Sequence, residues 1–146
     1  MRDMPKTIYV INGPNLNLLG QREPELYGAD TLEDVERLTA EAADDGYEIR
    51  PLQSNHEGQL VTWIQEARED GVGIVINAGA YSHTSIAILD ALSAFDGPVM
   101  EVHVTNIHAR ETFRHKSYVS LRANGLIAGL GVDGYAVAVA RICKLT

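Results

Sequence analysis

The chain has 146 residues, which is the usual size of one domain and is enough to bury a sizeable core. Hydrophobic residues make up 45% of the sequence, and this fraction argues against global disorder. The formal net charge of -8 argues against nucleic acid or an anionic membrane as a partner, so an anionic ligand would need a local pocket of clustered arginine.

Short β-branched runs alternate with amphipathic stretches along the first part of the chain. Residues 7–11 predict a strand, and a loop rich in glycine, proline and asparagine follows it. A capping box of Thr31 and Asp34 opens a helix that we expect Gly46 to stop. The apolar residues of this helix recur at helical spacing: Leu32, Val35, Leu38 and Ala42. Residues 47–52 predict an edge strand, because a proline lies near the end of the run.

The middle of the chain continues this alternation. A second helix, which ends near Gly71, is predicted from apolar residues at positions i, i+3, i+4 and i+7: Leu60, Trp63, Ile64 and Ala67. Residues 73–77 form a continuous apolar run, as expected for a strand buried on both faces. A third helix carries Ile86, Leu89 and Leu92 and ends near Asp96. Residues 99–104 predict a fourth strand.

The last part of the chain completes the pattern. A polar loop with room for a short helix covers residues 106–116, residues 126–130 predict a short fifth strand, and Asp133 is expected to cap a final helix to Lys144. The order βαβαβαβ(α)βα predicts an α/β fold in one domain over residues 1–146. We expect a flavodoxin-like three-layer sandwich with a five-stranded parallel sheet. Ligands of such sheets bind outside the carboxyl ends of the strands, near a switch point.

Polar segments follow four of the predicted strands, and they contain side chains suited to one kind of ligand. Several can hydrogen-bond neutral oxygens: Asn15, Asn77, His83, His103 and Thr105. Positive charge comes from Arg22, Arg110 and Arg114. Asparagine offers both a donor and an acceptor, arginine can fork a carboxylate, and histidine can give a proton near neutral pH. The set therefore suits a small polyhydroxylated carboxylate.

The loop between Gly20 and Gly28 contains Arg22 and Tyr27. A free tyrosine has a pKa of about 10 and is a poor base at neutral pH. A nearby arginine favours the phenolate, because opposite charges within about 4–6 Å stabilise the ionised form. The pair is a candidate activated base. The alternative is that Tyr27 packs its ring and Arg22 is solvated, and the two residues by themselves favour that alternative.

Residues 129–134 match the dinucleotide-binding pattern G-x-G-x-x-G between a predicted strand and a predicted helix. Only residues 135–146 follow, which is too short a segment to complete a βαβ unit or to supply a ribose-binding acid. Asp133 would also place a negative charge where a pyrophosphate should bind. We therefore expect a tight turn with close packing of strand against helix.

A loose group of acid and imidazole side chains raises the question of a metal site: Glu101, His103, His108 and His115. Neither H-E-x-x-H nor C-x-x-C occurs in the sequence. Glu101 and His103 share one face of a strand, but a third ligand at a convincing spacing is missing. We expect no metal here.

The single cysteine and the N-terminal region bear on the cellular compartment. Cys143 cannot form an internal disulfide, and it lies in an apolar helical stretch, so a small core residue is favoured over a catalytic thiol. The apolar run of residues 8–11 is far too short for a signal peptide or a membrane span. We expect a cytoplasmic protein.

Four blocks of the sequence together resemble the signatures of type II 3-dehydroquinate dehydratases. They are NGPNLNLLGQREPELYG (12–28), QSNHEG (53–58), INAGAYSHTS (76–85) and EVHVTN-HARE-FR-S (101–117). They stand in the family's order, and the pattern covers nearly the whole chain. The resemblance implies a catalytic domain without metal or cofactor that converts 3-dehydroquinate to 3-dehydroshikimate through an enolate. That reaction serves the shikimate pathway of aromatic amino acid biosynthesis, or quinate breakdown.

The resemblance also implies catalytic roles for particular residues. Tyr27 would be the base that takes the C2 proton, Arg22 would hold it ionised, and Arg110 would add positive charge near it. His103 would be the general acid that protonates the departing C1 hydroxyl. Asn15 would stabilise the enolate through a water.

Substrate binding and assembly are implied in the same way. Asn77 and the backbone amides of Val104 and Thr105 would hold the carboxylate. His83 and Arg114 would bind the ring hydroxyls. Family members form dodecamers built from trimers, so Asp90 would reach the site of a neighbouring subunit. The family usually has serine where this chain has Thr105, which keeps the hydroxyl and the backbone amide.

Other functions stay open. A type I enzyme for the same reaction needs a Schiff-base lysine, but Lys6, Lys116 and Lys144 are poorly placed for one. A flavodoxin-like module could bind flavin or phosphate at the first loop, although residues 12–20 lack hydroxyls in a phosphate-cradling arrangement. A third alternative is an assembly protein without activity, against which the presence of the candidate catalytic side chains argues.

Overall fold

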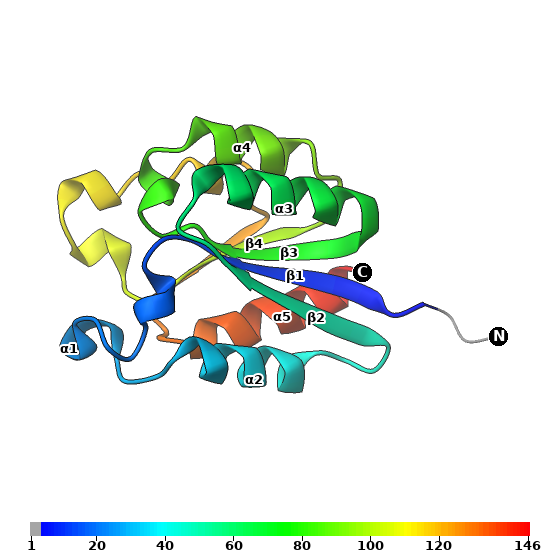
Figure 1. Ribbon diagram of the computed structural model, residues 1–146, viewed down its shortest axis with the longest axis horizontal. Helices are drawn as coiled ribbons and strands as arrows, with labels where there is room; N and C mark the ends of the chain where they lie inside the picture. Colours follow the sequence, from blue (N-terminus) through cyan, green and yellow to red (C-terminus); the bar gives the residue numbers. More distant parts are fainter. Residues whose placement is uncertain (1–3) are drawn as a thin grey trace.

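Five parallel strands form one sheet in the computed structural model, which describes residues 4–146 (Figure 1). They are β1 (Lys6–Asn12), β2 (Tyr47–Gln53), β3 (Gly71–Asn77), β4 (Val99–His103) and β5 (Gly125–Ala128). Their order across the sheet is β2-β1-β3-β4-β5, which is the flavodoxin-like order and confirms the predicted fold class. Residues 1–3, at the start of the N-terminal region for which we expect no signal peptide, lie outside the described residues.

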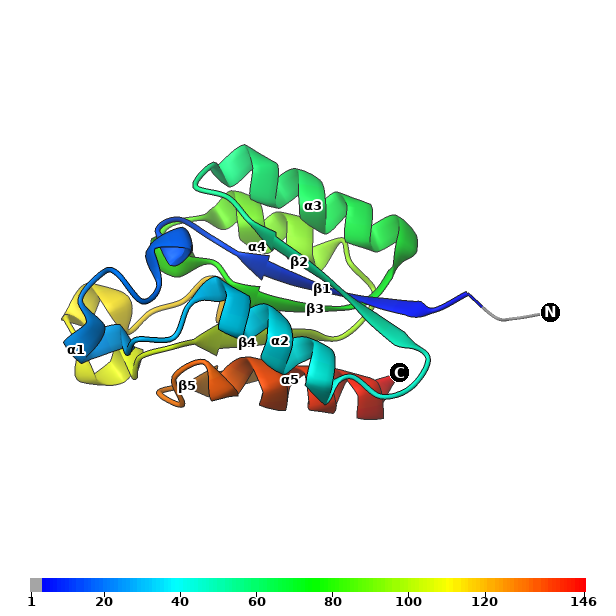
Figure 2. The same cartoon turned by 60° about the horizontal axis from the view of Figure 1, so that its bottom comes forward.

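Two helices cover each face of the sheet. They are α2 (Leu32–Ala42), α3 (Glu57–Asp70), α4 (Ile86–Ser93) and α5 (Asp133–Leu145). Figures 1 and 2 show α3 and α4 on one face and α2 and α5 on the other. Side chains alternate along a strand, so Ile8 and Val10 of β1 pack with the α2/α5 layer while Tyr9 and Ile11 pack with the α3/α4 layer.

Three local predictions need correction. Asp133 does not cap the last helix: Val132 is the N-cap residue, and Asp133 is the first helical residue, where its carboxylate still complements the positive end of the helix dipole. The first long helix ends at Ala42, and Gly46, with φ 87°, lies in the turn before β2 instead of stopping the helix. A short helix, α1 (Pro24–Tyr27), forms within the loop that joins β1 to α2.

The glycine-rich segment after β5 is a turn, as predicted. Gly129 and Gly131 have φ values of 86° and 61°, which other residues rarely adopt. A Cβ on Gly134 would lie 3.1 Å from Ile127 Cγ2 of β5, so α5 packs closely against the strand. Cys143, on the same helix, is buried in the core of the α2/α5 layer, which confirms its predicted structural position.

The loops that follow β1 and β3 touch at the carboxyl edge of the sheet. A Cβ on Gly13 would lie 2.4 Å from the carbonyl oxygen of Ala78, a distance at which no side chain fits. The amide of Gly13 donates to the carbonyl of Asn77 at 2.8 Å and so fastens the two loops together. Within residues 4–146, none of the helices is long and apolar enough to span a membrane.

Candidate functional site

A pocket opens at the carboxyl edge of the sheet, above the switch point between β1 and β3. It encloses about 690 Å³, including the part open to solvent, which suits a small ligand. Its walls come from the segments that follow β1, β3 and β4, and they carry the following polar side chains: Asn15, Arg22, Tyr27, Asn77, His83, His103, Thr105, Arg110 and Arg114. The predicted polar side chains therefore converge on one place, except for Asp90.

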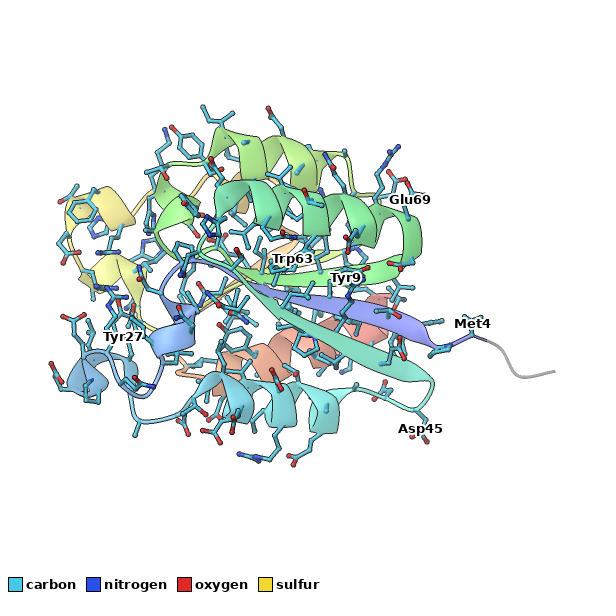
Figure 3. The ribbon with its side chains drawn as sticks, viewed as in Figure 1. Met4, Tyr9, Tyr27, Asp45, Trp63 and Glu69 are labelled. Carbon is cyan, nitrogen blue, oxygen red and sulfur yellow. The ribbon has the colours of Figure 1, made fainter. Side chains whose placement is uncertain are left out.

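Two arginines flank Tyr27, which lies at the end of α1 (Figure 3). Nη1 of Arg110 donates a hydrogen bond to the Tyr27 hydroxyl at 2.9 Å. The guanidinium carbons of Arg22 and Arg110 lie 5.2 and 5.3 Å from the centroid of the Tyr27 ring. Arg22 was expected to be the cation that holds Tyr27 ionised, but the direct contact to the hydroxyl comes from Arg110. Two cations therefore border Tyr27, and Arg110 is the one that is bonded to its hydroxyl.

The backbone of the first loop is unusual at two residues, of which Asn15 lines the pocket. Asn15 and Glu23 have φ values of 69° and 42°, in the left-handed region that residues with a Cβ seldom adopt. Asparagine tolerates this conformation better than most residues. The backbone N–H of Asn15 donates to Oδ1 of Asn55 at 3.0 Å, which helps to hold the loop in place. Glu23 opens α1, so the turn there sets the position of Tyr27.

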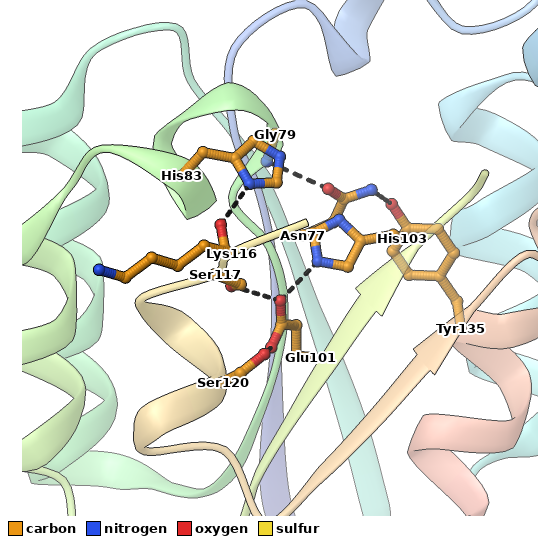
Figure 4. Close-up of polar contacts among 9 residues, drawn as sticks. All are labelled: Asn77, Gly79, His83, Glu101, His103, Lys116, Ser117, Ser120 and Tyr135. Carbon is orange, nitrogen blue, oxygen red and sulfur yellow. Dashed lines mark hydrogen bonds and ion pairs between the residues drawn. The ribbon is translucent and has the colours of Figure 1, made fainter. Parts of the chain in front are cut away.

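His103 is buried at the end of β4 and forms a close pair with Glu101 (Figure 4). Its Nε2 and Oε2 of Glu101 are 2.5 Å apart. The same carboxylate accepts from the hydroxyl of Ser117 at 2.7 Å and from the hydroxyl of Ser120. Burial by itself raises the pKa of Glu101, but the hydrogen bonds from His103, Ser120 and Ser117 outweigh it and lower that pKa below its usual value. Glu101 is therefore an ionised partner for the imidazole.

His83 stacks beside His103, with ring centroids 6.2 Å apart and an angle of 18° between the ring planes. Its Nδ1 lies 2.8 Å from the carbonyl oxygen of Lys116, to which it can donate. Burial, and to a lesser degree the neighbouring His103 and Arg114, lower the pKa of His83. A neutral His83 with Nδ1 protonated would offer the lone pair of Nε2 as an acceptor for a hydroxyl.

Asn77 ends β3 and belongs to a buried polar chain (Figure 4). Its Oδ1 accepts from the amide of Gly79 at 3.1 Å, and its Nδ2 donates to the Tyr135 hydroxyl at 2.9 Å. The Tyr135 hydroxyl in turn donates to Oδ1 of Asn12 at 2.6 Å. These bonds connect β1, β3 and α5 beneath the pocket.

The wall after β4 supplies Thr105 and Arg114. Oγ1 of Thr105 accepts from Nη1 of Arg110 at 3.3 Å, so the same guanidinium contacts both Thr105 and Tyr27. Nε of Arg114 donates to Oε2 of Glu111 at 2.5 Å. This bond holds the guanidinium group at the nitrogen nearest the backbone. The terminal nitrogens of Arg114 can then approach an oxygen of a ligand in the pocket.

The chain matches the family model described as Dehydroquinase class II over residues 6–143. It belongs to the class II dehydroquinase family. It is 63% identical over 143 residues to a 3-dehydroquinate dehydratase of Cereibacter sphaeroides, covering 97% of each chain. It is 64% identical to a 3-dehydroquinate dehydratase of Streptomyces avermitilis, covering 97% of this chain and 95% of that protein. A crystal structure of type II dehydroquinase from Propionibacterium acnes matches with a TM-score of 0.91 at 43% identity, covering 98% of this chain and 99% of that one.

Membership of the class II dehydroquinases confirms the resemblance seen in the sequence. The pocket brings together nearly all of the predicted site residues, including Val104, whose backbone was expected to contact a carboxylate. Asp90 is the exception: it lies exposed on α4 and does not line the pocket. Its expected contact with a neighbouring subunit stays a prediction.

Several residues of this dehydroquinase site were missed from the sequence. Glu101 was weighed only as a metal ligand, although its position two residues before His103 on one strand face was the signal for a pair. Ser117 closes the fourth block of the resemblance but was given no role, and Ser120 was not singled out, because their partner lies 16 and 19 residues away. Within residues 4–146 no three His, Cys, Asp or Glu side chains form a group that could hold a metal ion.

Proposed function

We propose that this class II dehydroquinase removes water from 3-dehydroquinate to give 3-dehydroshikimate. The observation that carries the proposal is the convergence of Tyr27, its hydroxyl bonded to an arginine, and His103, paired with a buried carboxylate, on one pocket. A base and an acid that share a pocket are what an elimination needs, and each positioned group contributes roughly 10²–10⁴-fold to the rate.

Tyr27 is the base in this mechanism. The Arg110 bond at 2.9 Å and the nearby Arg22 stabilise its phenolate. The phenolate takes the C2 proton, which the adjacent ketone makes acidic, and the electron pair moves onto the ketone oxygen to form an enolate. Asn15, which lines the pocket, stabilises the enolate through a water.

His103 is the general acid. The enolate collapses, the C1–oxygen bond breaks, and a proton from His103 converts the departing hydroxyl to water. Because Nε2 of His103 is engaged with Glu101, the proton leaves from Nδ1. The ionised Glu101 holds Nε2 of His103 and so fixes the orientation of the ring.

The remaining pocket residues hold the substrate. Asn77 and the backbone amides of Val104 and Thr105 bind the carboxylate, and His83 and Arg114 bind the ring hydroxyls. The preceding contacts support this division, because His83 is turned to offer Nε2 and Arg114 is braced by Glu111.

We further propose that the protein forms a dodecamer built from trimers, in which Asp90 contributes to the site of a neighbouring subunit. We also propose a cytoplasmic location. The exposed position of Asp90 on α4 is compatible with such a contact. Analytical ultracentrifugation measures the assembly, and a monomer would contradict it. The reaction itself serves the shikimate pathway or quinate breakdown equally well.

A spectrophotometric assay with 3-dehydroquinate tests the reaction, since the conjugated product absorbs where the substrate does not. We expect product both with and without borohydride treatment in the presence of substrate, because no imine forms. Activity lost on borohydride treatment would point to a Schiff-base lysine. Folded protein that makes no product would contradict the proposal, and thermal stabilisation by flavin would then favour the binding module.

A further inference from the structure

Tyr135 is fully buried on α5 and does not line the pocket, yet it contacts a residue that does. Its hydroxyl stands between two asparagine side chains, Asn12 of β1 and Asn77 of β3, at 2.6 and 2.9 Å. Figure 4 shows the Tyr135 hydroxyl meeting the nitrogen of the Asn77 amide, while the oxygen of that amide meets Gly79.

The direction of these hydrogen bonds is fixed from one end. The backbone amide of Gly79 can only donate, so the atom of Asn77 that it meets at 3.1 Å must be the oxygen. Nδ2 of Asn77 therefore faces the Tyr135 hydroxyl and donates to it. A tyrosine hydroxyl has one proton, which Tyr135 gives to Oδ1 of Asn12. Every bond in this chain thus runs the same way, from Gly79 to Asn12.

We propose that Tyr135 is a positioning residue for anion recognition, because it holds the Asn77 amide with a free N–H toward the pocket. Nδ2 carries two protons, and Tyr135 takes only one of them. A reversed amide would present an oxygen lone pair to the pocket and would repel a carboxylate. Tyr135 and Gly79 together therefore select the orientation that attracts an anion. The kinetic test of this inference rests on the proposed function, because it needs turnover of 3-dehydroquinate.

The expected kinetic signature follows from the chemistry of the carboxylate. Its charge does not change while water is eliminated elsewhere on the ring, so contacts with it stabilise the ground state and the transition state equally. Losing such a contact raises KM and leaves kcat unchanged. For Tyr135→Phe we expect KM for 3-dehydroquinate to rise about five- to tenfold, the usual effect of one neutral hydrogen bond, with kcat within about twofold.

A second variant removes the constraint without touching Tyr135 or the pocket. Asn12→Ala deletes the acceptor of the hydroxyl proton. The freed hydroxyl can then turn its proton toward Asn77 and oppose the N–H that faces it. We expect KM to rise in this variant too, although Asn12 is not among the pocket-lining residues.

Tyr9→Phe is the matched control. Tyr9 is also fully buried, and its hydroxyl donates to Asp70 and accepts from Arg50 at 2.7 Å. None of these three residues lines the pocket, and Figure 3 shows Tyr9 well apart from Tyr27. This variant also loses a buried hydroxyl, and we expect its melting temperature to fall. We expect its KM and kcat to match those of the unaltered enzyme.

Kinetics and NMR together decide the question. A raised KM in Tyr135→Phe and Asn12→Ala, but not in Tyr9→Phe, supports the positioning role of Tyr135. A KM within twofold of that of the unaltered enzyme in the first two variants overturns this role, and so does an equal rise of KM in the control. If the unaltered chain shows no turnover, the proposed function fails, and the side-chain amide NMR signals of Asn77 still test the inference. We expect two well-separated proton signals, of which the one bonded to Tyr135 is protected from solvent. These signals should merge toward ordinary values in the Tyr135 and Asn12 variants, and unchanged signals would refute the role.

Discussion

Replacing Glu101 with glutamine keeps the size of the side chain and removes its charge. Glu101 is completely buried and receives hydrogen bonds from His103, Ser117 and Ser120. A hydrogen bond to a charged group contributes about 1.5–3 kcal/mol and a neutral one about 0.5–1.5 kcal/mol. The His103 bond therefore weakens by about 1–1.5 kcal/mol, which corresponds to a roughly tenfold fall in kcat when that bond stabilises the acid. We expect KM to stay within about twofold.

The same substitution has a defined pH signature in stability. The hydrogen bonds from His103, Ser120 and Ser117 overcome the opposing effect of burial and hold the pKa of Glu101 below its ordinary value of 4.5. A carboxyl group with a depressed folded-state pKa stabilises the fold fully above the unfolded-state value, and this contribution is lost as the pH falls through the folded-state pKa. The stability advantage of the unaltered chain over Glu101→Gln should therefore be constant near neutrality and shrink below pH 4.5.

Two measurements check these expectations. Steady-state kinetics at pH 7 give kcat and KM, and urea unfolding between neutrality and acid pH gives the stability difference. Glu66→Gln is the control, because Glu66 pairs with Arg50 at 3.1 Å at a partly exposed position away from the pocket. An unaltered kcat in Glu101→Gln would refute the role of the buried carboxylate, and a stability gap that widens in acid would refute the assigned ionisation.

Tyr27→Phe and His103→Ala should each lower kcat by roughly 10²–10⁴-fold while isothermal titration still detects substrate binding, and near-normal turnover would remove that residue from its role. Dialysis against a chelator should leave turnover unchanged, whereas activity lost and then restored by a metal ion would contradict a metal-free mechanism. Gly73→Ala should destabilise the fold by about 1–3 kcal/mol in urea unfolding, because its Cβ would lie 2.5 Å from Ile142 Cγ2. Gly58→Ala, which meets nothing within 4 Å, is the control and should not destabilise it.

Elements with a strong local pattern were predictable from the sequence. Residues 73–77 read as a doubly buried strand, and β3 is one. The capping box at Thr31 forms as expected, with the Asp34 side chain accepting from the Thr31 amide at 2.8 Å. The site could be placed at the strand ends because ligands of parallel sheets bind there, so the polar candidates followed once the strands were located. The roles of those residues, and the choice of Val104 and Asp90, came from the family resemblance.

Contacts between distant segments were not predictable in this way. Arg110 and Tyr27 are 83 residues apart, and Tyr135 and Asn77 are 58 apart, so no local spacing links either pair. Asp133 was assigned as a cap from residue type alone, but the turn before α5 places Val132 at that position. Side-chain partners depend on the exact path of turns such as these, and sequence pattern does not fix that path.

The proposed anion site, in a chain of net charge -8, requires that nearby carboxylates do not face the ligand. The carboxylates of Glu101 and Glu111, which lie beside the pocket, both accept hydrogen bonds from neighbouring side chains. Glu101 beside His103 has both oxygens occupied by donors, so neither oxygen is left to face a ligand. Glu111 contacts Nε of Arg114, which leaves the terminal nitrogens of that guanidinium for a ligand. Positive charge therefore dominates locally because of how each carboxylate is bonded, and overall composition does not decide what the pocket binds.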